Sequence, residues 1–186
     1  GYTIQPYSPA AGTGFSSHEL NQPGCYRDVK DTSATALFTA RQETLTSDAL
    51  KPADGDVHFT AWTTTPWTLP SNTALCVGPK IDYVLVKTFN QYSGNSMNIV
   101  LAKALVAKQL SGKYVEAENE DEFKAYEFGA KRIPYTIIDE VKGADMVGTR
   151  YEQLLPYAQP YQDADQAFQV ISGDFVTTED GTGIVH

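Results

Sequence analysis

Three consecutive threonines, Thr63 to Thr65, are the residues whose type and spacing first suggest chemistry. They lie in the stretch FTAWTTTPWTLPSN, residues 59–72, which contains no charged residue. Threonine hydroxyls are too weak as bases to deprotonate water at neutral pH, but they can hold a water molecule or a carbonyl oxygen. They are therefore best suited to hydrolysis of an already activated ester, such as an aminoacyl ester of a ribose hydroxyl, where positioning matters most.

Two other groups could belong to the same site. Asn72 adds an amide that both donates and accepts hydrogen bonds. The stretch Gly181-Thr182-Gly183 permits close approach of the backbone to a ligand, and His186 follows it. Structural interpretations stay open, because threonine also suits strands that pair across a sheet and a lone histidine is often structural.

Composition predicts a globular domain. The chain has 186 residues, of which 41% are hydrophobic and 20% charged, enough for one domain with its own core. No apolar run reaches the length of a membrane span, and GYTIQPYSPA does not resemble a signal peptide. Cys25 and Cys76 lack CxxC spacing, so free thiols in the cytoplasm are expected, with neither a metal nor a cofactor.

Net charge limits the partners. The formal charge of -9 argues against a domain that grips nucleic acid by electrostatics alone. If a polyanion is the substrate, most of the grip must come from outside this chain.

The residue pattern predicts mainly strands. Residues 1–24 are rich in Gly, Pro, Ser and Tyr and predict an irregular stalk. Apolar alternation and turn residues predict strands over 29–40, 56–64, 73–79, 81–89, 97–102, 133–141, 166–176 and 181–186. Helices are expected over 102–113 and 120–128. Because strict strand–helix alternation is missing, a closed or nearly closed β-barrel is favoured over a doubly wound sheet.

At this point the motifs resemble a known family. WTTTPWTLPSN together with GTGIVH resembles the editing (CP1) domain inserted into isoleucyl-tRNA synthetase, a class I aminoacyl-tRNA synthetase. CYRDVKDTSATALF, VKGADMVGTRYEQLLPY and YSPAAGTGFSSHEL resemble further parts of the family, so the resemblance covers essentially the whole chain.

Two alternatives remain beside it. The editing domains of the valine and leucine enzymes typically carry an arginine after the paired threonines and end the GTG motif with Met or Lys, whereas this chain has Pro66 and His186. A non-catalytic β-barrel binding module is the other alternative, in which the threonines pack across strands and the GTG stretch is a turn.

The resemblance implies a fold and an activity. It implies a closed six-stranded β-barrel with a few peripheral α-helices, residues 1–24 being a stalk from the catalytic domain and residues 25–186 an editing domain. It implies hydrolysis of valine from mischarged tRNA(Ile), because one missing methylene is worth only about 1–3 kcal/mol, for which the isoleucine enzyme is itself the standard example. The implied partners are the CCA end of tRNA(Ile), the valine moiety and the rest of the synthetase, without a membrane.

The resemblance also implies roles for single residues. Thr63, Thr64 and Thr65 would line the hydrolytic pocket, Asn72 would help to fix the attacking water, and His186 would exclude the longer isoleucine side chain. The remaining expected substrate-binding residues are Trp67, Thr182 and Gly183.

Some parts of the family pattern are not in this sequence. The family's ammonium-binding aspartate follows the GTG stretch downstream and is expected beyond His186, so the editing domain is expected to be truncated at its C-terminal end. The sequence contains neither the HIGH nor the KMSKS signature. Aminoacylation is therefore not expected of it.

Overall fold

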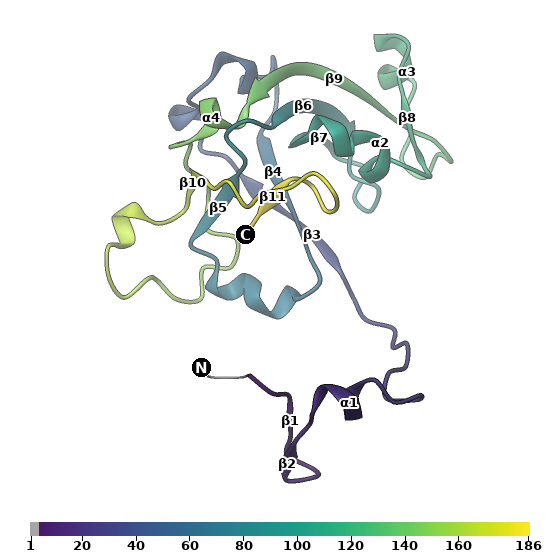
Figure 1. The fold of residues 1–186 in the computed structure, drawn as a ribbon. Coiled ribbons are helices and arrows are strands. Elements are labelled where there is room, and N and C mark those ends of the chain that lie inside the picture. Colours follow the sequence, from purple (N-terminus) through teal and green to yellow (C-terminus); the bar gives the residue numbers. More distant parts are fainter. Residues whose placement is uncertain (1–3) are drawn as a thin grey trace. The chain divides into compact units, whose positions relative to one another are not determined.

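The computed structural model describes residues 4–186 and divides into two compact units (Figure 1). The first unit extends to Asp31 and the second begins at Thr32. The predicted boundary lay between residues 24 and 25. The assignment of the two parts to a stalk and an editing domain stays a prediction.

The first unit contains more regular structure than the sequence predicted. Strands β1 (Tyr7–Ser8) and β2 (Thr13–Gly14) pair antiparallel, and α1 (Ser17–Leu20) follows. A capping box begins α1, because the Ser16 hydroxyl accepts the Glu19 backbone N–H and the Glu19 carboxylate accepts the Ser16 N–H. The expectation of irregular structure is therefore wrong for residues 7–8, 13–14 and 17–20. These local hydrogen bonds order the chain without any hydrophobic period.

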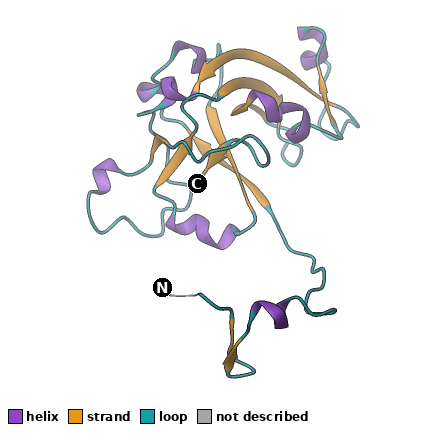
Figure 2. Ribbon diagram, viewed as in Figure 1, coloured by secondary structure: helices purple, strands orange, loops and turns teal. Residues whose placement is uncertain are grey.

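A six-stranded mixed sheet forms the frame of the second unit (Figures 1 and 2). In spatial order its strands are β3 (Ala34–Thr39), β4 (Val57–Thr63), β7 (Ser96–Ala102), β6 (Asp82–Phe89), β9 (Ile133–Lys142) and β8 (Tyr114–Glu116). The pairs β4–β7 and β8–β9 are parallel and the other pairs are antiparallel. The central strands are buried on both faces, which explains their long apolar runs.

Alternate residues of these strands build two separate cores. On β6, Tyr83 and Leu85 belong to the larger apolar cluster, and Val84 and Val86 belong to the smaller one. Val106, which lies in the chain segment after β7, also belongs to the smaller cluster. The sheet is therefore the middle layer of the unit.

A three-stranded sheet covers the larger core. Its central strand β5 (Ala74–Val77) pairs parallel with β10 (Gln169–Ser172) and antiparallel with β11 (Ile184–Val185). Leu75, Val170 and Ile184 belong to the same cluster as the large sheet's inner side chains. This packing brings the chain segment after Thr63 and the segment that ends at His186 to the same small sheet.

Helices are short (Figure 2). The α-helices of the second unit are α2 (Val106–Gln109), α3 (Glu120–Lys124) and α4 (Gly143–Met146). The 3-10 helices are η1 (Gln42–Thr44), η2 (Asp48–Leu50), η3 (Pro66–Ser71), η4 (Lys103–Leu105) and η5 (Ala164–Gln166). Within residues 4–186, every helix is too short or too polar to cross a membrane.

The fold is mainly β with a few short helices, as predicted. None of the sheets formed by residues 4–186 closes on itself, since β3 and β8 are edges of the large sheet. The closed six-stranded barrel therefore stays a prediction.

Candidate functional site

The threonine run forms the turn between β4 and η3. Thr63 is the last residue of β4 and is buried on the core side, because it continues the alternation of Phe59 and Ala61. Its Oγ1 accepts the backbone N–H of Thr65 at 3.0 Å and lies 3.3 Å from the Thr65 hydroxyl. Pro66 then begins η3, where its fixed φ suits the first helical turn. The strand predicted over 56–64 therefore ends at Thr63, before Pro66.

The Thr65 hydroxyl is part of a chain of three. It lies 3.4 Å from Thr68 Oγ1, and the Thr68 hydroxyl donates to the Thr65 carbonyl at 2.7 Å. Thr65 thus lies between a buried hydroxyl, Thr63, and a more exposed one. Its oxygen thus has a neighbouring hydroxyl on each side, and Thr65 itself is exposed.

These residues border a concavity of about 570 Å³, which we name the threonine hollow. It lies between η3, the small sheet and the segment after β10. Its lining residues are Thr65, Thr68, Ser71, Asn72, Thr73, Ala74, Cys76, Ile171, Phe175, Val185 and His186. Polar groups therefore come from the η3 side, and apolar side chains come from β10, β11 and Phe175.

The hollow is electrically neutral. Within residues 4–186 its lining contains no Asp, Glu, Lys or Arg side chain. Burial lowers the pKa of the His186 imidazole, which favours the neutral ring, and burial raises the pKa of the Cys76 thiol. The site thus offers hydrogen-bonding groups rather than a strong base or a thiolate.

Asn72 is held by a residue that the sequence did not single out. The buried Tyr151 donates its hydroxyl to Asn72 Oδ1 at 2.6 Å, and Asn72 Nδ2 donates to the Ala74 carbonyl at 2.8 Å. Burial raises the pKa of Tyr151, so it remains a donor. Asn72 is 8% exposed and lines the hollow with this side chain held in place. A tyrosine at this distance in the chain, 79 residues from Asn72, gives no local signal.

The GTG stretch is buried against neighbouring strands and does not line the threonine hollow. Thr182 is only 2% exposed, and its hydroxyl donates to the Thr60 carbonyl at 2.6 Å. A Cβ added to Gly183 would lie 2.5 Å from the Cβ of Ala102. The Gly183 carbonyl accepts the Tyr83 hydroxyl at 2.6 Å. These contacts anchor the strand that carries His186.

The structure brings together part of the predicted site. Thr65, Asn72 and His186 line one hollow, and Thr63 contacts Thr65 from the core side. The remaining predicted residues lie outside its lining: Thr64 and Trp67 are exposed, the latter by 67%, and Thr182 and Gly183 are buried.

Sequence reasoning missed several lining residues. Thr68, Ser71 and Thr73 stand in the same quoted stretch or next to it, so their small polar side chains were a usable signal. Ile171, Phe175 and Val185 had no such signal, because they follow the alternation of ordinary strands. Within residues 4–186, no group of three or more His, Cys, Asp or Glu side chains could hold a metal ion.

Comparison with solved structures defines the class of fold. The crystal structure of GlLeuRS-CP1 matches with a TM-score of 0.54 at 14% identity, over 83% of this chain and 52% of that one. The editing domain of the P. knowlesi cytosolic leucyl-tRNA synthetase matches with a TM-score of 0.50 at 14% identity, over 84% and 58% of the two chains. The second unit thus has the fold of aminoacyl-tRNA synthetase editing domains.

Sequence comparison identifies the family. No protein-family model matches the chain. Isoleucine–tRNA ligases of Bacteroides thetaiotaomicron and Cytophaga hutchinsonii are 55% and 56% identical to it over 197 and 186 aligned residues. The Bacteroides fragilis enzyme is 58% identical over 189 residues. All three alignments cover 100% of this chain, which spans only 15–16% of the length of these relatives. The chain is therefore related, over its whole length, to one segment of the isoleucine–tRNA ligases, as its motifs predicted.

Proposed function

We propose that this chain is the post-transfer editing domain of an isoleucine–tRNA ligase and hydrolyses the ester between valine and tRNA(Ile). One observation carries the proposal. The Thr65 hydroxyl, the Asn72 amide and the His186 imidazole line one neutral hollow together with apolar side chains. The relationship to isoleucine–tRNA ligases and the editing-domain fold support it.

The hydroxyls position water rather than activate it. Thr63 holds the Thr65 N–H, and Thr68 lies beside the Thr65 hydroxyl, so the Thr65 oxygen has a defined place at the hollow. From there it orients a water molecule or the ester oxygen, and the Asn72 amide helps to fix that water. An aminoacyl ester is already reactive, and a ribose hydroxyl of the substrate relays the proton. No strong protein base is required.

Selection between valine and isoleucine comes from the opposite wall. Ile171, Phe175 and Val185 provide apolar contacts for a small aliphatic side chain. The neutral His186 ring sets the size limit, so isoleucine is excluded by its additional methylene. A site that excludes the larger substrate supplies the discrimination that binding alone does not give.

The surroundings of the site are also part of the proposal. The substrate is the aminoacylated CCA end, which is flexible enough to reach a domain whose net charge is -9. The rest of the synthetase, in the cytoplasm, supplies the main grip on tRNA. Residues 1–24 lead from the catalytic domain.

A closed barrel is supported by the hydrogen bonds from Thr182 to Thr60 and from Ala102 to Thr182, which join the last segment to two strands of the large sheet.

The test is replacement of Thr65 by valine, which has nearly the same shape without the hydroxyl. In a complete isoleucine–tRNA ligase carrying this segment, we expect release of valine from valyl-tRNA(Ile) to slow by about 10²-fold, the usual size of one lost transition-state contact. Isoleucine activation is the control and stays unchanged. Equal deacylation by Thr65→Val and wild type contradicts the role of Thr65.

A further inference from the structure

A second, smaller hollow lies directly behind the polar wall of the first. Its volume is about 250 Å³. Ser71, Asn72 and Thr73 line both hollows, so a segment of three residues is all that separates them. The opposite side comes from the loop after Tyr151, and we name this cavity the glutamine hollow after Gln153 and Gln159.

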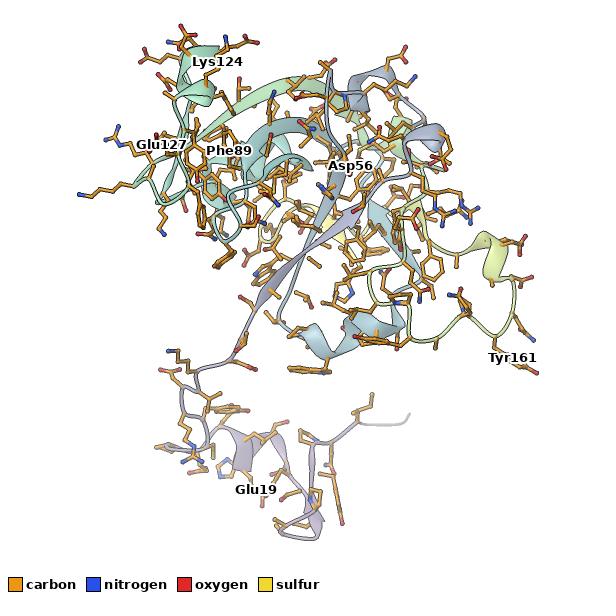
Figure 3. All side chains as sticks on the ribbon, turned by 180° about the vertical axis from the view of Figure 1, so that it is seen from behind. Glu19, Asp56, Phe89, Lys124, Glu127 and Tyr161 are labelled. Atoms are coloured by element: carbon orange, nitrogen blue, oxygen red, sulfur yellow. The ribbon has the colours of Figure 1, made fainter. Side chains whose placement is uncertain are left out.

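Hydrogen bonds within the loop fix its glutamines. Gln153 Nε2 donates to the Ala158 carbonyl at 2.8 Å, and Gln159 Nε2 donates to Gln153 Oε1 at 2.7 Å. Within residues 4–186, no protein partner is found for Gln159 Oε1 or for the hydroxyls of Ser71 and Thr73. These three residues are exposed, so one amide acceptor and two hydroxyls are accessible to a ligand at the hollow. By contrast Tyr161, further along the same loop, points away into solvent (Figure 3).

The other walls of the glutamine hollow are apolar. Pro70 and Pro160 contribute rings, and Phe168 is 7% exposed. Phe168 is held by its N–H bond to the Thr73 carbonyl at 2.7 Å and by an edge contact with Tyr151, whose ring centroid is 6.2 Å away. No charged side chain among residues 4–186 lines the hollow. Its chemistry suits a neutral planar ring with polar edges and does not suit a phosphate.

We propose that the glutamine hollow binds a nucleobase of the unpaired 3′ end whose aminoacyl ester lies in the threonine hollow. This inference rests on the proposed function, because the ester then places the neighbouring nucleotides within reach of the shared wall. The prolines and Phe168 contact the faces of the base, and Gln159, Ser71 and Thr73 contact its edge. Unpaired bases are recognised in this way, by apolar faces and by hydrogen bonds to their edges.

The test uses a complete isoleucine–tRNA ligase carrying this segment and two non-hydrolysable probes. One probe is valyl-adenosine with an amide in place of the ester, and the other is the same mimic extended to valyl-CCA. Ala158→Phe fills the hollow from an exposed position, and Gln159→Leu removes its amide. Gln166→Leu, on an exposed residue of the same loop outside the hollow, is the matched control.

We expect Ala158→Phe to weaken binding of valyl-CCA by about tenfold or more, as loss of one stacked base does, and Gln159→Leu to weaken it less. A parallel loss for valyl-adenosine assigns the hollow to the terminal base, and a loss for valyl-CCA alone assigns it to a preceding base. Unchanged affinity of both variants for both probes overturns the proposal. If wild type still releases valine from tRNA in that case, the proposed function stands, and if wild type does not release valine the function itself fails.

Discussion

Thr65 is the threonine best placed for chemistry, for reasons that lie in its immediate neighbours. Thr63 faces the core and serves Thr65 as an acceptor, and Thr64 is exposed at the turn. Only the third threonine of the run lines the hollow. A run of identical residues thus divides into a support, a turn position and a residue that lines the hollow, because β4 ends at Thr63.

His186 carries a prediction about selectivity. Shrinking it to alanine removes the imidazole from the wall of the threonine hollow. In a complete ligase, we expect wild type to spare isoleucyl-tRNA(Ile) and His186→Ala to hydrolyse it, with deacylation of valyl-tRNA(Ile) changing by less than about tenfold. Rates of deacylation of the two purified aminoacyl-tRNAs measure this. Continued sparing of isoleucyl-tRNA by the variant shows that another residue sets the limit.

Two histidines predict a pH dependence of stability. Burial lowers the pKa of His58 and of His186 below the ordinary 6.5, although the charge of Asp56 partly opposes this at His58. Below pH 6.5 the unfolded chain therefore binds more protons than the folded chain. The free energy of unfolding is thus greatest above that pH and decreases as the pH falls through the lowered values.

Thermal unfolding at about pH 7.5 and about pH 5 measures the effect. Replacing His58 and His186 together by asparagine is expected to reduce the loss of Tm between these conditions. The exposed His18, replaced in the same way, is the control. An identical loss of Tm in the double variant and in wild type contradicts the assignment to these two side chains.

The candidate site was predictable where polar residues cluster in the sequence. Thr63, Thr65 and Asn72 stand within ten residues of one another and are close in space. Tyr151 and Phe175 were not predictable, because long-range packing brings them to the site. At Gly183, the absence of a side chain allows Ala102 to lie close to the backbone. A sequence shows that a glycine is needed, but does not show which neighbour requires it.

Strands were predicted more reliably than helices at the scale of elements. The alternation over 56–64 and 81–89 matches β4 and β6 closely. The expected helix over 120–128 ends at Lys124. No helix was predicted at α4, which begins with Gly143. Long alternating runs are decided by burial in a sheet, whereas single helical turns depend on caps and on local packing.

The short strand β11 predicts a packing requirement. Gly183 precedes it with φ +76°, and an added Cβ would lie 2.5 Å from the Cβ of Ala102 on β7. We expect Gly183→Ala to lower the free energy of unfolding by about 1–3 kcal/mol, the usual cost of overpacking, plus the strain of the positive φ. Chemical denaturation measures the change.

A second variant separates the two causes. Ala102→Gly, combined with Gly183→Ala, removes the clash but leaves the backbone strain. The double variant is expected to recover part of the lost stability relative to Gly183→Ala alone. Gly183→Ala with the stability of wild type contradicts the close approach of the two segments.

The arrangement of the whole second unit was the least predictable feature. The large sheet joins β4 to β7 by parallel pairing, although β5 and β6 lie between them in the sequence. No local pattern specifies such pairs, because each strand needs only an apolar partner face. The family resemblance supplied the class of fold, and the match to the leucyl-tRNA synthetase editing domain of P. knowlesi bears out that class, while the closed barrel stays a prediction.

The two-unit organisation predicts that the second unit folds alone. Within the described chain, neither apolar core includes a residue before Ala36, and the unit begins at Thr32. A fragment of residues 32–186 is therefore expected to keep the Tm of the full chain to within a few degrees, since a change of about 1 kcal/mol corresponds to only about 2–4 °C at this size. Calorimetry of both chains measures this.

Phe38→Ala, which truncates a fully buried ring in β3, is the matched control and should lower the free energy of unfolding by about 3–5 kcal/mol. A fragment that unfolds as early as this variant shows that residues 1–31 stabilise the sheet and that the two units are one cooperative structure.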